Sequence, residues 1–387
     1  MPHPGPLFGT AGVLKLMAGT HPVTIGIDLG GTSLRVGLFD DSMAMLDSHS
    51  MPTRAAAGPQ AAVDEMAAAV RLILKRTNTN GSIYEPRGVG IGSPGPINLC
   101  SGVLGLLPNL PGWDNFPLRA ALRDATGLPV ILESDANAAA IAEWKLGVGK
   151  TTGVSSMVML TLGTGVGSGI IINGKIWHGM FGMGGEVGHA TVEPSGLLCG
   201  CGSRGCLEMY ASANGLLRLA REAADGQSST SALRDLVATP EGFTAMQVAH
   251  LAQAGDLAAK VAFERLGSYL GIGIANLINT LDVPLIVVGG GLASAWKLFN
   301  ESMFQTIHDY SVVYRLVAPT QRLTMEKDCT YICPAVLGPA AGLLGAALLP
   351  HLESPPQAFE AVATSQRRLP DENPPARPGT SYRRPGA

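Results

Sequence analysis

The sequence VTIGIDLGGTSLRVGLF, residues 23–39, decides the fold of this protein. Its apolar alternation predicts two strands, Val23–Asp28 and Leu34–Phe39, joined by a turn at a pair of glycines. The same order of strand, glycine turn and strand recurs over residues 157–172. We therefore expect an α/β protein in which two lobes repeat one fold.

The chain is long enough for two lobes, because its 387 residues exceed the size that one hydrophobic core usually serves. We expect a small lobe over residues 22–133 and a large lobe over residues 134–338. A closing helix at residues 339–350 would complete the small lobe. Residues 1–21 are expected to form a flexible leader, and residues 351–387, rich in proline and arginine, a disordered tail.

Composition limits the partners of the protein. A net charge of −3 and a pI near 6.2 argue against a surface that binds nucleic acid. The start of the chain does not resemble a signal peptide, and no apolar run is long enough to cross a membrane. Three of the six cysteines lie close together, which is typical of metal binding in a reducing compartment. We therefore expect a cytoplasmic protein with neither nucleic acid nor membrane as a partner.

Three glycine-rich segments are candidates for binding a nucleotide. Amides in a glycine turn can approach phosphate oxygens, a threonine hydroxyl can add a donor, and an aspartate can hold Mg²⁺. Each segment could also be an ordinary turn, but three in this order favour a nucleotide site. A Walker-type loop is absent, and the first turn leads into a strand, unlike a dinucleotide-binding unit. The candidates are Asp28, Gly30, Gly31 and Thr32; Gly163, Thr164 and Gly165; and Gly289, Gly290 and Gly291.

A cysteine-rich loop, residues 186–208, has the composition of a zinc site. His189, Cys199, Cys201 and Cys206 offer three thiolates and one imidazole, a closed tetrahedral set. Four protein ligands leave no position for a catalytic water, so a Zn²⁺ ion here would be structural. The alternative is a group of reduced cysteines without a metal.

Three carboxylates are candidates for binding and activating a polyhydroxyl substrate. Glu186 and Glu208 flank the cysteine-rich loop and could each accept hydrogen bonds from neighbouring sugar hydroxyls, although solvated surface charge is the alternative. Asp135 opens an alanine-rich helix, and its pattern predicts a helix N-cap. A carboxylate at such a strand–helix junction could also accept the proton of a hydroxyl that attacks a phosphate.

With these motifs, the chain resembles the ROK family of sugar kinases and sugar-responsive repressors, within the actin-like ATPase superfamily. The resemblance runs from about Thr24 to Leu349. It implies a two-lobed actin-like ATPase fold, ribonuclease H-like, with a zinc-stabilised loop insert. It also implies an ATP-dependent, glucokinase-like enzyme that uses Mg²⁺. The motifs that carry it are Asp28–Thr32, Gly90–Pro96, Asn109–Trp113, Asp135–Ala140, Leu160–Gly169, Glu186–His189, Cys199–Glu208 and Val287–Leu292.

The resemblance also implies roles for individual residues. Asp135 would be the general base for the 6-hydroxyl of the sugar, and His189 would use one ring nitrogen for zinc and the other for the sugar. The glycines of the first two loops would face phosphates and Mg²⁺, and Gly289–Leu292 the adenosine. Ser33 and Ser134 stand where relatives commonly have other residues. The implied sugar-binding residues are Gly92, Ser93, Asn109, Ser134, Asp135, Glu186, His189 and Glu208.

The resemblance leaves several alternatives open. N-acetylglucosamine, N-acetylmannosamine, mannose and fructose kinases share these motifs, and a few relatives use polyphosphate as donor. A transcriptional repressor is disfavoured, because no helix-turn-helix pattern precedes the first predicted strand. A non-catalytic sugar sensor is disfavoured by the retained carboxylates and glycine loops. The expected partner is a hexose, glucose first, and the expected assembly is a homodimer or homotetramer.

Overall fold

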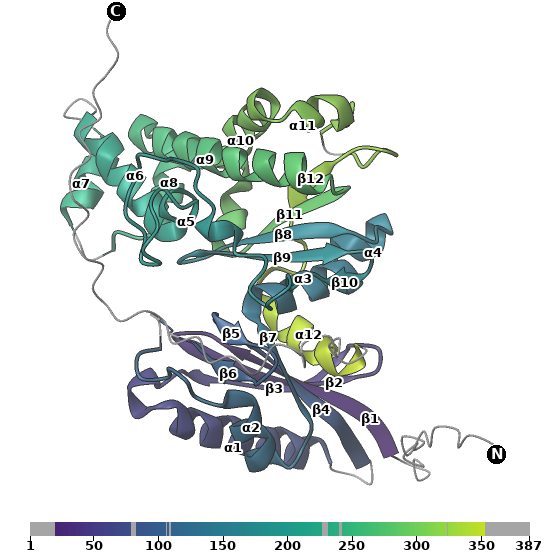
Figure 1. Ribbon diagram of the computed structural model, residues 1–387. Helices are drawn as coiled ribbons and strands as arrows, with labels where there is room; N and C mark the ends of the chain where they lie inside the picture. Colours follow the sequence, from purple (N-terminus) through teal and green to yellow (C-terminus); the bar gives the residue numbers. More distant parts are fainter. Residues whose placement is uncertain are drawn as a thin grey trace, which may run out of the picture. The chain divides into compact units, whose positions relative to one another are not determined.

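The computed structural model describes residues 20–78, 83–105, 107, 110–226, 231–239, 242–322 and 324–352 (Figure 1). The predicted sugar-binding residue Asn109 lies outside these ranges, as do residues 1–19 and 353–387, most of the expected leader and tail. The first strand begins at Thr20, so residues 20 and 21 belong to a sheet and not to the leader. In the part of the chain that is described, no helix has the length and apolar character to cross a membrane.

The first sheet has five strands in the order β3-β2-β1-β4-β7. The first three strands of the chain form an antiparallel meander, and the other two lie parallel to β1. The predicted hairpin is the β1–β2 pair, in which Asp28 lies opposite Arg35. The bounds are β1 Thr20–Leu29, β2 Ser33–Asp40, β3 Met45–Pro52, β4 Ile83–Ser93 and β7 Val130–Ser134.

The second sheet repeats this design, with the order β10-β9-β8-β11-β12. Again three strands form an antiparallel meander and two further strands run parallel to the first of them. The predicted repetition of one fold in two lobes is therefore confirmed. The bounds are β8 Met157–Leu162, β9 Val166–Ile172, β10 Lys175–Ile176, β11 Leu285–Gly289 and β12 Tyr331–Pro334; the short strands β5 Ile97–Asn98 and β6 Val103–Leu104 pair separately.

Helices cover one face of each sheet with a hydrophobic core. Alternate residues of β1, beginning at Val23, are buried together with apolar residues of α1 and α2. The large-lobe core joins β8 and β11 to α6, α9 and α10, and α9 and α10 lie side by side (Figure 1). The bounds are α1 Pro59–Thr77, α2 Leu118–Thr126, α4 Val148–Thr152, α5 Glu208–Ala211, α6 Ala213–Gly226, α7 Ala232–Ala238, α8 Ala245–Gln253, α9 Leu257–Leu281, α10 Trp296–Tyr310 and α11 Val312–Val317.

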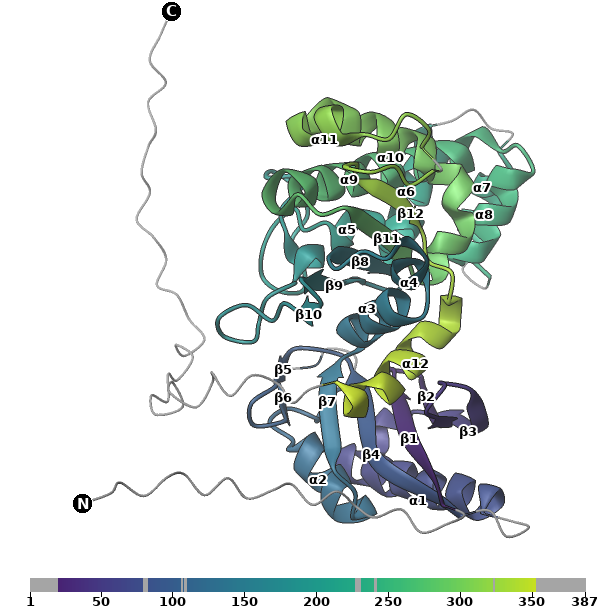
Figure 2. The same cartoon turned by 90° about the vertical axis from the view of Figure 1, so that its right-hand side faces the viewer.

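Two helices, α3 (Asp135–Lys145) and α12 (Ala341–Leu348), lie between the two sheets (Figures 1 and 2). Glycines in the strands let each helix pack closely on a sheet. A Cβ on Gly26 of β1 would lie 2.5 Å from the carbonyl oxygen of Leu343 in α12, and a Cβ on Gly169 of β9 would lie 2.4 Å from the Cβ of Ala140 in α3. α12 packs on β1 and β4, and α3 on β9. The start of α3, where Asp135 lies, is thereby fixed between the sheets.

Candidate active site and metal centre

Asp135 is the first residue of α3, directly after β7. The expectation that Asp135 caps the helix is wrong: Ser134 has the extended backbone of an N-cap, and its hydroxyl oxygen accepts a hydrogen bond from the amide of Asn137 at 3.1 Å. The Asp135 carboxylate instead accepts a bond from the neighbouring amide of Ala136 at 2.7 Å. Because Ser134 serves as the cap, the carboxylate of Asp135 keeps acceptor capacity for another group.

The surroundings of Asp135 raise its pKa to about 6. Burial of the carboxylate is the largest cause, and the negative charges of Asp28 and Glu186 raise the pKa further. Asp135 is exposed by its accessible surface, yet protein atoms fill most of the space around its carboxylate, and these surroundings govern the cost of ionisation. Asp28 on β1 and Glu186 in the loop before His189 therefore lie close enough to Asp135 to act on its pKa.

A buried carboxylate beside Asp135 was not found from the sequence. Glu133 accepts hydrogen bonds from the amide of Ser134 at 2.8 Å and the side chain of Asn137 at 2.9 Å. Its other oxygen lies 2.7 Å from Nε2 of His178, on the loop after β10. This network fixes the first turn of α3. In the sequence, Glu133 is only a glutamate two residues before the candidate base. That spacing belongs to no motif, so it gave no reason to select this residue.

The first glycine loop is a tight turn between β1 and β2. The amide of Gly30 donates to the carbonyl of Ser33 at 2.9 Å, and the hydroxyl of Thr53 donates to the carbonyl of Gly30 at 2.7 Å. Thr32 is exposed, so its hydroxyl can reach a ligand. Asp28 pairs with the guanidinium of Arg35, a residue that the sequence analysis did not select.

The second and third glycine segments meet at one cavity of about 550 Å³ in the large lobe. Gly290 lies against the backbone of Leu162 with a φ of +83°; a Cβ there would be 2.5 Å from the amide nitrogen of Leu162. The volume is in the range of cofactor pockets. The lining residues are Leu162, Gly163, Ala213, Ala245, Met246, Ala249, His250, Gln253, Gly291, Leu292, Ser294 and Ala295.

Helix α8 supplies a wall of this cavity that sequence reasoning missed. Ala245, Ala249 and Gln253 lie four residues apart, on one face of the helix, and Met246 and His250 extend that face. Helical periodicity could have revealed the face. Its residues carry no motif that indicates a ligand, so only the fold places them beside the glycine loops.

The four predicted metal ligands converge. The Sγ atoms of Cys201 and Cys206 lie 3.7 Å apart, as do Sγ of Cys199 and Nδ1 of His189, and all four ligand atoms lie within 4.8 Å of one another. Atoms about 2.3 Å from a shared centre at tetrahedral angles stand about 3.8 Å apart. The donor set and its spacing therefore fit Zn²⁺, with Nδ1 of His189 as the ring nitrogen nearest the thiolates.

Val166, at the start of β9, contacts both ends of the cysteine-rich loop. Its amide donates to the carboxylate of Glu208 at 3.0 Å. Gly188, two residues after Glu186, packs so closely that a Cβ on it would lie 2.0 Å from the carbonyl oxygen of Val166. Glu208 also lies directly against Gly165. The structure thus brings the cysteine-rich loop to the second glycine loop.

The segment containing Gly92 and Ser93 lies beside the candidate base. A Cβ on Gly92 would be 3.5 Å from the Cα of Asp135, and Ser93 is fully buried at the end of β4. Gly92 therefore leaves room for α3 to begin over the end of β4.

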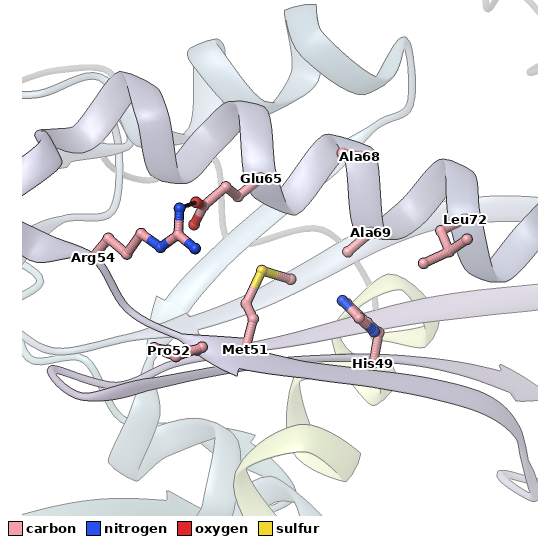
Figure 3. Close-up of a pocket in the computed structure, with 8 residues that line it drawn as sticks. All are labelled: His49, Met51, Pro52, Arg54, Glu65, Ala68, Ala69 and Leu72. Carbon is pink, nitrogen blue, oxygen red and sulfur yellow. Dashed lines mark ion pairs between the residues drawn. The ribbon is translucent and has the colours of Figure 1, made fainter.

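A second cavity, of about 300 Å³, lies between β3 and α1 (Figure 3). Its walls include His49 and Met51, and an ion pair of Arg54 and Glu65 at 3.4 Å closes one side (Figure 3). None of the predicted site residues lines this cavity. The Arg54 side chain of its ion pair is 72% exposed, and such a pair contributes little, so we assign this cavity no role in the chemistry.

Known proteins resemble this chain over nearly all of the described residues. Residues 24–353 match the ROK family. A glucokinase of Streptomyces coelicolor is 36% identical over 337 residues, 86% of this chain and 99% of that protein. An N-acetylmannosamine kinase of Citrobacter koseri is 31% identical, over 84% of this chain and 98% of that protein.

Comparison with solved structures points to the same family as the comparison of sequences. A ROK family glucokinase from Streptomyces griseus, in complex with glucose and AMPPNP, superposes with a TM-score of 0.66 at 31% identity, over 84% of this chain and 98% of that one. The repeated sheets, the clustered carboxylates and the Cys₃His group agree with these matches. On this evidence, the chain belongs to the ROK family.

Proposed function

We propose that this protein transfers the γ-phosphoryl group of ATP to the 6-hydroxyl of glucose. That it is an ATP-dependent sugar kinase rests on its relatives, which include glucokinases at 34–36% identity. The observation that carries the finer assignment is the position of Asp135. This carboxylate is near enough to both Asp28 of the first glycine loop and Glu186 of the cysteine-rich loop for their charges to raise its pKa. This nearness to one candidate phosphate residue and one candidate sugar residue supports the proposal that Asp135 acts where the two substrates meet.

Asp135 acts as the general base in this proposal. Its carboxylate accepts the proton of the 6-hydroxyl as the oxygen attacks the γ-phosphorus, and ADP leaves. A pKa near 6 leaves the group ionised at neutral pH and a better base than an ordinary aspartate. Ser134 and the Glu133 network hold the first turn of α3, so the carboxylate is positioned before the sugar binds.

The other predicted residues bind and orient the two substrates. Glu186, His189 and Glu208 would accept or donate hydrogen bonds to the ring hydroxyls, beside Gly92 and Ser93. The glycine-loop amides would donate to phosphate oxygens, and the cavity between Gly163 and Gly291 would hold the adenosine. Mg²⁺, when bound near Asp28, would neutralise phosphate charge. We propose that the lobes over residues 22–133 and 134–338 close around the bound sugar and exclude water.

The Cys₃His group would hold a structural Zn²⁺ ion. The ion would fix the cysteine-rich loop and with it the orientation of Glu186 and Glu208. His189 would connect the metal to the substrate, because Nδ1 faces the thiolates and leaves Nε2 for a sugar hydroxyl. Reduced thiolates agree with a cytoplasmic location, which we also propose.

N-acetylmannosamine is the second candidate substrate, because a kinase for this sugar matches the chain over nearly its full length. The decisive measurement is sugar-dependent ADP release with ATP and a panel of glucose, mannose, fructose, N-acetylglucosamine and N-acetylmannosamine. We expect glucose to give the highest kcat/KM. A higher value for an N-acetyl sugar would reassign the substrate, and no sugar-dependent release would refute the kinase proposal.

The raised pKa of Asp135 predicts an acid limit to activity. Because the base must be ionised, kcat/KM for the sugar should fall about tenfold per pH unit below pH 6. Replacing Glu186 by glutamine removes one of the charges that raise this pKa, so the acid limb should move to lower pH even though activity falls. The check is a pH series from 4.5 to 8.5 on both proteins; a flat profile between pH 5 and 7 would contradict the assignment.

A further inference from the structure

Arg35 forms an ion pair with Asp28 that the proposed mechanism does not use. The two residues lie directly opposite each other in the β1–β2 ladder, and the guanidinium Nη2 contacts Oδ2 of Asp28. The Arg35 side chain is 33% exposed and that of Asp28 is 17% exposed. The pair is thus partly shielded but still open to a ligand.

The side chain of Arg35 lies on the face of the sheet that carries the active site. Gly26 and Gly37, each two residues from a member of the pair, have no room for a side chain. A Cβ on Gly26 would lie 2.5 Å from Leu343 of α12, and a Cβ on Gly37 would lie 2.7 Å from the ring of Phe39 and 3.1 Å from Leu343. Residues two apart on a strand share a face, so Asp28 and Arg35 point toward the layer of α12 and α3. A Cβ on Gly342 of α12 would lie 3.1 Å from the Asp28 carboxylate, which agrees with this direction.

Arg35, Asp28 and Gly92 form one row of residues in register across three strands, and Asp135 lies over the end of this row. Asp28 is in register with Gly92 on β4, and Gly92 lies beneath the Cα of Asp135. Neighbouring strands stand about 4.8 Å apart. Arg35 on β2 and Asp135 therefore lie on one face, separated by β1 and β4, with the first glycine loop at the same end of β1.

Positive charge near this row would offset the negative charge that collects there when ATP binds. Asp28, Asp135 and Glu186 form a negative group, and the γ-phosphoryl group brings further negative charge to it. A guanidinium offers several N–H donors in a planar fork that matches phosphate oxygens. We propose that Arg35 is a catalytic residue that leaves Asp28 and donates to the γ-phosphoryl oxygens of bound ATP, stabilising the charge of the transferred group.

This inference rests on the proposed kinase function, and three variants test it separately. R35Q removes the charge, R35K keeps the charge without the planar fork, and R87Q is the matched control. Arg87 lies on β4 of the same sheet and pairs with Asp41 at 3.0 Å on an exposed surface, where such a pair contributes little. The measurements are kcat, thermal denaturation, and calorimetric titration with Mg²⁺ and either AMPPNP or ADP.

We expect R35Q to lower kcat about 100-fold, the lower range for loss of one preorganised donor, while R35K loses about tenfold and R87Q stays within about twofold. R35Q should weaken AMPPNP at least about tenfold and ADP less than about twofold, because only AMPPNP has a γ-phosphoryl group. Equal weakening of both nucleotides, or a kcat within about threefold of the parent, would overturn the role of Arg35. A parent protein without sugar-dependent ADP release would refute the kinase proposal instead.

Discussion

Replacing Asp135 by asparagine is expected to lower kcat about 1,000-fold and to leave the dissociation constant of the sugar within about threefold. Asparagine has nearly the same shape and can still accept the bond from the amide of Ala136, but it cannot take a proton from the attacking hydroxyl. The measurements are sugar-dependent ADP release and calorimetric titration of the sugar. D64N is the matched control, because Asp64 lies exposed on α1.

The D135N variant should also remain folded, which makes a loss of activity interpretable. The pKa of Asp135 is raised above its usual value, so the folded protein favours the protonated carboxyl. The contribution of this group to the free energy of unfolding is fully present below pH 3.8 and is lost as the pH rises through about 6. A neutral asparagine avoids this cost at pH 8. We expect a melting temperature at least equal to that of the parent. Activity within about tenfold of the parent in a folded D135N protein would show that another group is the base.

Replacing Cys206 by serine is expected to remove the bound zinc and nearly all kinase activity. Cys206 is fully buried, its Sγ lies 3.7 Å from that of Cys201, and Glu208 follows two residues later. Loss of one thiolate leaves a tetrahedral Zn²⁺ site with three protein ligands and weakens metal binding. Binding of a structural Zn²⁺ ion contributes on the order of 10 kcal/mol to the folding of small zinc-dependent domains. The segment carrying Glu186 and Glu208 would then lose its fixed geometry.

The zinc prediction is checked by metal analysis of the purified proteins together with the ADP-release assay. C100S is the control, because Cys100 is an exposed thiol outside the cluster. A zinc chelator should inactivate the parent protein in parallel with metal loss, and added Zn²⁺ should restore activity. Full activity after the metal has been removed would show that the loop keeps its geometry without it.

The sequence by itself determined the features that depend on neighbours along the chain. Two glycine-turned hairpins predicted the repeated fold, since strand alternation and glycine turns are local patterns. The grouping of His189 with three cysteines was predictable as well, because three of the four residues lie within eight positions, Cys199 to Cys206, and their chemistry favours one kind of site. The edge strands β3 and β10 were missed: β3 has eight residues but none of them is buried, and β10 has only two residues.

The tertiary structure alone decided which distant side chains meet. Glu133 and His178 are 45 residues apart, and α8 lies beside the glycine loops because it packs into the large-lobe core. The position of Arg35 follows from the register of β1 and β2 and from the packing of α12 on the glycine face. Local propensity fixes which elements form, because it acts over a few residues. Long-range burial of apolar faces fixes which of them come together, and no short stretch of sequence encodes that outcome.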